Sequence, residues 1–217
     1  MHIPDGLLPP TVCILGYGVT GGVTWFSLRQ INKQGNSEQQ IPKASLLTAA
    51  FFVASLIHIP VPPASVHLVL NGMMGIVLGY YAFPAILIGL LFQTIFFHHG
   101  GLSTLGINAV IMGVPALIGY YLWSLRRVFT SIFDRTWATN VVAFCASSVT
   151  ILLSALIFVF ITLNNIAPDL DIATEKTAIL TSLIGYGVQA IIEGVLTVML
   201  INFLLKVKPE IMEMVHK

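Results

Sequence analysis

The first two residues of the chain, Met1 and His2, carry nitrogen atoms that could hold one metal ion. They offer the free amine of Met1, the backbone nitrogen of His2 and the Nδ1 atom of the His2 imidazole. The amine and the amide nitrogen would close a five-membered chelate ring, and the amide nitrogen and Nδ1 a six-membered one. Three nitrogens in one plane suit Ni(II) and Cu(II), and less strongly Co(II). Because the ion must displace the amide proton, we expect binding to weaken as the pH falls.

The next residues give this terminus its shape. Pro4 fixes its own φ and restricts Ile3, so residues 1–9, which we call the hook, should leave the bundle in a stiff, extended form. A fourth nitrogen ligand must come from elsewhere in the chain. The alternative interpretation is that His2 is an ordinary polar residue at a frayed terminus.

The composition indicates what must position the hook. Of the 217 residues, 9% are charged and 56% hydrophobic, and the mean hydropathy is +0.90, whereas soluble domains carry about 25% charged residues. We therefore predict an all-α integral membrane protein with a single membrane domain over 1–217. The net charge of +1 gives no indication of nucleic-acid binding. Cys13 and Cys145 lie in apolar runs and are expected to be buried hydrophobic residues. No cleavable signal peptide is expected, because no basic residue precedes the first apolar run.

Seven stretches are apolar and approach the length of about 20 residues that a bilayer requires. Polar segments or segments rich in proline and glycine separate them. We therefore predict a bundle of about seven transmembrane helices at 10–28, 44–57, 65–81, 84–97, 105–125, 138–163 and 177–205.

The charged loops give this bundle a direction. With seven spans, the basic residues of 29–43, of 126–135 and of the C-terminal tail fall on one side. The other side receives the hook and the remaining loops, including an acidic one with Asp169, where Lys176 is the one basic residue. The positive-inside rule places the basic side in the cytoplasm. The chain is thus expected in the cell (inner or cytoplasmic) membrane, with its N-terminus outside and its C-terminus in the cytoplasm.

Five of the six histidines fall on the predicted outer edge, and only His216 lies in the inner tail. The five are His2, His58, His67, His98 and His99. This sorting is not expected of scattered core histidines. His67 follows the rigid Pro62-Pro63 pair at a predicted helix start, and we interpret it as the fourth ligand. The alternative is a polar residue at a helix start, hydrogen-bonded to the backbone.

Several other polar residues are candidates for supporting roles. His98 and His99 precede Gly100-Gly101 and could form a lid over a bound ion, or simply an interfacial loop. Asp5 could accept a hydrogen bond from a ligand N–H, or instead cap the first helix or make local hydrogen bonds.

Three polar residues lie within or at the ends of the predicted helices. Asn71 and Asn108, near outer helix ends, could brace the hook through hydrogen bonds. Glu193 lies deep within a predicted span, where a charge is costly and suggests a functional site. The alternative is a protonated or paired acid packed against other helices, with Gln189 one turn away as a partner.

Three segments of the chain resemble the CbiM/NikM family, the substrate-capturing membrane subunits of energy-coupling-factor cobalt and nickel transporters. They are Met1-His2-Ile3-Pro4-Asp5-Gly6, Ser65-Val66-His67-Leu68 with Asn71-Gly72, and the run from His99 to Asn108. The resemblance covers essentially the whole chain, and its N-terminal motif is highly specific. It implies that the Met1 amine, the His2 amide and imidazole, and the His67 imidazole hold the ion in a near-planar set. The His98-His99 doublet stands where one histidine is expected, so the resemblance does not decide which of the two occupies the family position.

The resemblance also implies partners. These are a transmembrane coupling subunit, two cytoplasmic ATPase subunits and often a small accessory membrane subunit, which some members carry fused at the C-terminus. Because this chain stops at Lys217, we expect any accessory subunit to be separate.

The predicted function is the high-affinity substrate-binding subunit of an ATP-driven nickel or cobalt importer. The chain is not expected to be an enzyme or to need a cofactor beyond the transported ion. It has no GxxxxGK[ST] motif, so partner subunits would hydrolyse ATP. The planar nitrogen set favours Ni(II) mildly, but Cu(II) should bind it at least as well.

Three alternative classes fit the sequence less well. A haem- or metal-bearing membrane oxidoreductase subunit would need histidines facing each other from within neighbouring helices. A membrane metalloenzyme would need a motif such as HExxH. A plain helical scaffold would leave the sorting of the histidines unexplained.

Overall fold

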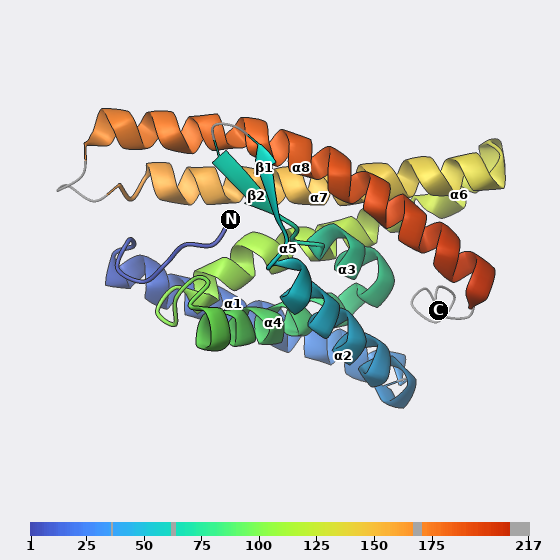
Figure 1. Ribbon diagram of the computed structural model, residues 1–217. Helices are drawn as coiled ribbons and strands as arrows, with labels where there is room; N and C mark the ends of the chain where they lie inside the picture. The colour runs from blue at the N-terminus through green and yellow to red at the C-terminus, as the bar shows by residue number, and fades with distance from the viewer. Residues whose placement is uncertain (36, 62–63, 167–170, 209–217) are drawn as a thin grey trace.

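The computed structural model describes residues 1–35, 37–61, 64–166 and 171–208, which form a helical bundle with one short β-hairpin (Figure 1). Pro62, Pro63, Asp169, His216 and Lys217, named above, lie outside these residues. In chain order the elements are α1 (Pro10–Gln34), α2 (Ser37–Ala54), β1 (His58–Val61), β2 (Ala64–His67), α3 (Asn71–Leu78), η1 (Gly79–Tyr81), α4 (Ala82–Phe97), α5 (Leu105–Ser124), α6 (Arg126–Ile132), α7 (Arg135–Leu163) and α8 (Ile172–Val207).

The predicted membrane bundle is confirmed, with an approximate count of spans. In the described residues, five helical stretches are long and apolar enough to cross a membrane: Pro10–Gln34, Asn71–Phe97, Leu105–Ile132, Arg135–Leu163 and Ile172–Val207. A shorter apolar helix covers Gln40–Ala54. The stretch 71–97 combines two predicted helices, and the chain changes direction within it at η1 (Figure 1), where Gly79 has a φ of 58°.

The prediction of a helix over 65–81 is wrong in its first part. Ala64–His67 is instead an antiparallel strand in which His67 stands opposite His58, and helix α3 begins only at Asn71. In a helix starting at 65, the N–H groups of Val69 and Leu70 would bond to carbonyls four residues back. Here both N–H groups donate to the Glu193 carboxylate.

The predicted polar loop over 29–43 is also mostly helical. Helix α1 continues to Gln34, and α2 starts at Ser37. Lysine, arginine and glutamine are good helix formers, so their polarity did not end the helix. Gly35 ends it instead, with a φ of 69° in the left-handed region, which glycine adopts at little cost.

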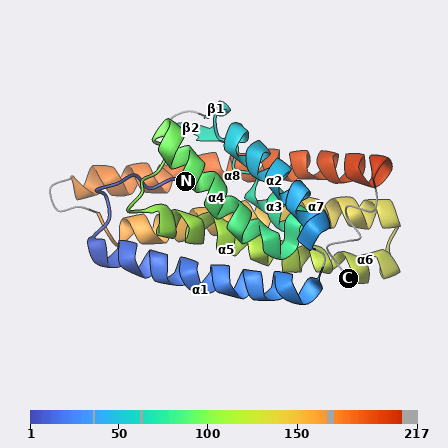
Figure 2. The same cartoon turned by 90° about the horizontal axis from the view of Figure 1, so that it is seen from below.

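The centre of the bundle is α5, which contacts α1, α3, α4 and α7, while α7 and α8 pack along each other (Figures 1 and 2). All eight residues of α3 are buried. The segments that carry most of the basic residues, at the ends of α1 and α8 and around α6, gather at the end of the bundle away from the start of α1 (Figure 2).

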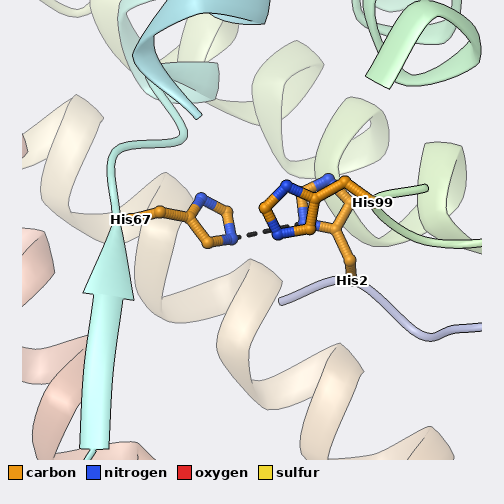
Figure 3. A group of neighbouring side chains, drawn as sticks. All are labelled: His2, His67 and His99. Atoms are coloured by element: carbon orange, nitrogen blue, oxygen red, sulfur yellow. Dashed lines mark hydrogen bonds between the residues drawn. The ribbon is translucent and has the colours of Figure 1, made fainter. Parts of the chain in front are cut away.

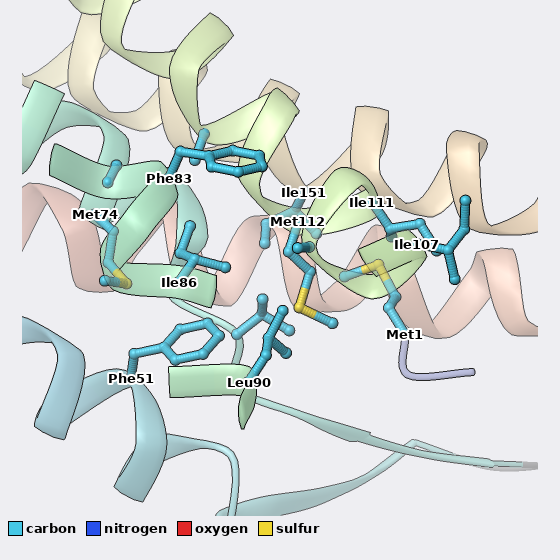
Figure 4. Close-up of a cluster of buried hydrophobic side chains, with 14 of the residues drawn as sticks. Met1, Phe51, Met74, Phe83, Ile86, Leu90, Ile107, Ile111, Met112 and Ile151 are labelled. Carbon is cyan, nitrogen blue, oxygen red and sulfur yellow. The ribbon is translucent and has the colours of Figure 1, made fainter. Parts of the chain in front are cut away.

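The N-terminal residue belongs to the hydrophobic core. The side chain of Met1 is 6% exposed and joins the largest buried cluster, where Figure 4 shows it beside the residues of α5. This cluster also includes Phe51, Phe83, Ile107 and Met112. Burial of a methionine side chain contributes about 1.5–3 kcal/mol, so the hook is anchored rather than frayed.

Candidate metal-binding site

Three imidazoles that are far apart in the sequence meet at the hook. One ring nitrogen each from His2, His67 and His99 lies within 4.8 Å of the other two. His2 comes from the hook, His67 from the end of β2, and His99 from the loop after α4 (Figure 3). Imidazole nitrogens are common ligands of first-row transition metals, so this cluster has the chemistry of a metal site.

The His2 ring is oriented by a buried glutamine of α4. Gln93 is fully buried, and its Nε2 donates to the carbonyl of Phe51 at 3.4 Å. Its Oε1 must therefore accept the 2.8 Å hydrogen bond from Nε2–H of His2. This fixes the tautomer in which Nδ1 of His2 carries a lone pair. Nδ1 is the atom that would close the six-membered chelate ring with the His2 amide nitrogen.

The His67 ring offers the matching atom. Its Nδ1 lies 3.3 Å from the carbonyl oxygen of Leu68, to which it donates, so Nε2 carries the lone pair. Nε2 of His67 lies 3.2 Å from Nδ1 of His2. For metal–nitrogen bonds of about 2.0 Å, neighbouring ligands in a square plane lie about 2.8 Å apart. The two nitrogens are thus spaced close to what one shared ion requires.

The backbone of the hook is held by the side chain of Asn108, which bonds both an N–H and a carbonyl group as a neighbouring β-strand would. The Asn108 amide accepts a hydrogen bond from the N–H of Ile3 at 2.9 Å and donates one to its carbonyl at 3.0 Å. The Thr104 hydroxyl also donates to that carbonyl at 2.6 Å. Ile3 is 1% exposed. The residue after His2 is therefore held on both of its backbone groups.

Asp5 ties the hook to the loop before α5. Its carboxylate accepts hydrogen bonds from the N–H groups of Leu102 and Ser103 at 3.1 and 2.8 Å, and from the Ser103 hydroxyl. These bonds hold the pKa of Asp5 below its usual range. A Cβ atom on Gly101 would lie 2.0 Å from the carboxylate, so only glycine fits there. Asp5 thus caps this loop, and the predicted cap of the first helix is wrong, since α1 has no side-chain cap.

The amine of Met1 is buried together with its side chain. Burial lowers the pKa of this amine to about 5, against an opposing effect of the Glu193 charge. Burial, followed by the nearby amine and His67, also holds the pKa of His2 well below its usual range. Both groups are therefore neutral near pH 7 and present lone pairs rather than protons to an ion.

Glu193 holds the segment that carries His67. It is fully buried in α8, and its carboxylate accepts from the N–H groups of Val69 and Leu70 at 2.6 and 2.8 Å and from Gln189 at 2.8 Å. It thereby fixes the backbone just before α3, where Leu70 has a φ of 58°. This placement agrees with the interpretation of a paired acid packed against other helices.

The remaining candidates, Asn71 and His98, do not belong to the histidine cluster. Asn71 donates to the Met112 carbonyl and the Ser154 hydroxyl, so it joins α3 to α5 and α7 and does not brace the hook as predicted. His98 is exposed and ends α4 with a φ of 52°. Its ring is outside the cluster, although the residue lines the surrounding pocket with Met1, His2, Pro4, His67, His99 and Gly100.

Sequence reasoning missed Gln93 and Thr104. Gln93 was hidden inside an apolar run, and its signal was that it is the only strongly polar side chain in that helix. Thr104 lies in the motif that carried the family resemblance, but it had no separate chemical signal.

Known proteins resemble this chain over its whole length. A family model described as the cobalt uptake substrate-specific transmembrane region matches residues 2–211. A putative cobalt transport protein CbiM of Methanosphaera stadtmanae is 32% identical over 98% of the chain and 94% of the relative.

Other relatives match part of the chain. A putative metal transport protein of Haemophilus influenzae is 42% identical over 58% of the chain and 59% of the relative. A fused nickel transport protein NikMN of Rhodobacter capsulatus is 35% identical over 52% of the chain and 33% of the relative. The chain thus spans less than two thirds of these two proteins.

A solved structure has the same fold. The crystal structure of a truncated transition metal transporter superposes with a TM-score of 0.72 at 20% identity, covering 95% of this chain and 99% of that one.

Proposed function

Since the chain belongs to the CbiM family of multi-pass membrane proteins for metal uptake, we propose that it captures Ni(II) or Co(II) with high affinity at the extracytoplasmic face for an ATP-driven importer. The observation that carries this proposal is the pair of ring nitrogens, Nδ1 of His2 and Nε2 of His67, that face each other at 3.2 Å. The family consists of metal transport proteins, so the oxidoreductase alternative is not retained.

The proposed ligands are the Met1 amine, the His2 amide nitrogen, Nδ1 of His2 and Nε2 of His67. Three observations support this set. The Met1 amine is buried and neutral, the Gln93 bond leaves Nδ1 of His2 free for a metal, and Asn108 fixes the backbone just after His2. Together they reduce the ordering that binding must supply, which favours high affinity.

The proposed orientation places the hook outside the cell. The basic segments at the opposite end of the bundle support it through the positive-inside rule. After capture, a transmembrane coupling subunit driven by two cytoplasmic ATPases would reorient the chain and release the ion inward. A small accessory membrane subunit completes the proposed complex.

The transported ion is nickel or cobalt. Two of the relatives described above carry cobalt and nickel in their names, and the four-nitrogen plane suits Ni(II). The proposal therefore covers both ions, and binding measurements must compare them.

The decisive experiment compares the purified protein starting at Met1 with a version carrying one extra residue before Met1. The extra residue moves the free amine and destroys the five-membered chelate ring. We expect Ni(II) affinity, measured by competition with a chromogenic chelator, to fall by more than about 100-fold. This is a larger loss than the removal of a residue that only hydrogen-bonds to a metal ligand would cause. His98→Ala is the matched control and should bind as the native chain does. Unchanged binding by the extended, folded protein would refute the site.

A further inference from the structure

The His99 ring does not lie in line with the His2 and His67 rings, which face each other edge to edge. Its ring stacks on that of His2, with centroids 4.9 Å apart and an interplanar angle of 25°, and it is tilted by 53° from that of His67 at 5.3 Å. Figure 3 shows the His99 ring overlying the His2 ring, while the dashed line from His67 reaches His2 at its edge. The His99 ring therefore covers one face of the site.

His99 is held in this place by α4. Its N–H donates to the carbonyl of Gln93 at 3.2 Å, and its own carbonyl accepts from the Thr94 hydroxyl at 3.2 Å. Gln93 thus fixes His2 through its side chain and His99 through its backbone. Next to it, Gly100 has a φ of 83°, and a Cβ there would lie 3.0 Å from Asn108. These contacts fix the backbone on both sides of the His99 side chain.

A ligand above a plane of four nitrogens discriminates between ions by their preferred geometry. Ni(II) with four strong in-plane nitrogens accepts square-planar coordination, whereas Co(II) more readily takes a further ligand. The three ring nitrogens lie within 4.8 Å, so His99 must approach by less than about 2 Å to share an ion at bond lengths of about 2.1 Å. Rotation of one side chain can supply such a movement.

We propose that His99 is an out-of-plane ligand that binds Co(II) in addition to the four nitrogens of the hook site, and that it sets the affinity for Co(II) relative to Ni(II). This rests on the proposed function, because the plane must exist for His99 to stand above it. His98 provides the matched control, since it is the neighbouring imidazole, lines the same pocket and lies outside the cluster.

The test measures Ni(II) and Co(II) binding to the native chain and to the His99→Ala and His98→Ala variants. In His99→Ala we expect Co(II) affinity to fall by about 10- to 100-fold, while Ni(II) affinity changes by less than about 3-fold. The visible absorption of bound Co(II) should change from a five-coordinate to a four-coordinate spectrum. Circular dichroism and gel filtration would confirm the fold.

Three results would overturn the inference. Equal Co(II) affinity and an identical Co(II) spectrum in the His99→Ala and His98→Ala variants would leave His99 only a cover. Equal losses of Ni(II) and Co(II) binding in a folded His99→Ala variant would make it a structural support. A four-coordinate Co(II) spectrum in the native chain, which requires no substitution, would also exclude the ligand. Failure of the proposed function itself is seen separately, in the protein with the extra N-terminal residue.

Discussion

The two imidazoles that meet at 3.2 Å are held by different parts of the molecule. His2 is fixed by α4 and α5, through Gln93 on its ring and Asn108 on the neighbouring backbone. His67 stands at the end of a hairpin strand, and the backbone just after it is fixed by Glu193 of α8. One half of the site thus belongs to the centre of the bundle, and the other half to its last helix.

This difference means that each half of the site can be altered separately. Both halves are fixed by buried hydrogen bonds, so neither is flexible by itself. The substitutions below separate the two halves, and we order them from the largest expected effect to the smallest.

Glu193→Ala should have the largest effect, because it removes the acceptor of two backbone N–H groups and leaves them buried without partners, which costs about 1–3 kcal/mol each. We expect Ni(II) affinity to fall by about 100-fold and hydrogen exchange to rise at Val69 and Leu70 but not at Ile3. Gln189→Leu is the control, since it removes one bond to Glu193 and leaves the two backbone bonds. If Glu193→Ala bound Ni(II) with unaltered affinity, the support of the site by α8 would be contradicted.

Asn108→Ala should have an intermediate effect on the other half. It removes both hydrogen bonds to the Ile3 backbone, while Thr104 still donates to the Ile3 carbonyl. We expect a loss of about 10-fold in Ni(II) affinity, with faster hydrogen exchange at Ile3 and no change at Val69. If exchange instead rose at Val69, the two halves would be one cooperative unit.

Asp5→Asn should have the smallest effect, since the carboxylate is exposed and Asn keeps one acceptor oxygen. We expect Ni(II) affinity to fall by less than about 5-fold. The lowered pKa of Asp5 means that its contribution is complete above the unfolded pKa of about 3.9 and is lost only as the pH falls through the folded value. Between pH 5 and 7, the ratio of native to variant affinity should therefore stay constant, and a change in that ratio would contradict the assignment.

The parts of the fold predicted from the sequence are those decided by local pattern. Apolar length predicted the membrane helices, and the sequence indicated Asn108 as a brace of the hook, as the structure has it. The start of α3 was not predictable, because the residue that decides it, Glu193, lies 124 positions from Val69. Asn71 was assigned to the hook from its place at a helix end, but tertiary packing directs it to α5 and α7. Gln93 was missed because its role, to accept a hydrogen bond from the His2 ring, depends on a residue 91 positions away in the sequence.

The burial of α3 has a consequence for the order in which the chain is made. All eight of its residues are covered by protein, with contacts to α5, α7 and α8, and the two N–H groups just before it, of Val69 and Leu70, donate to a carboxylate on α8. A growing chain that has reached only α5 lacks both α7 and α8, and with α8 it lacks this carboxylate. The His67 strand can reach its final position only after α8 has been synthesised and inserted. The proposed metal site can therefore form only once all of the helices that support it are in place.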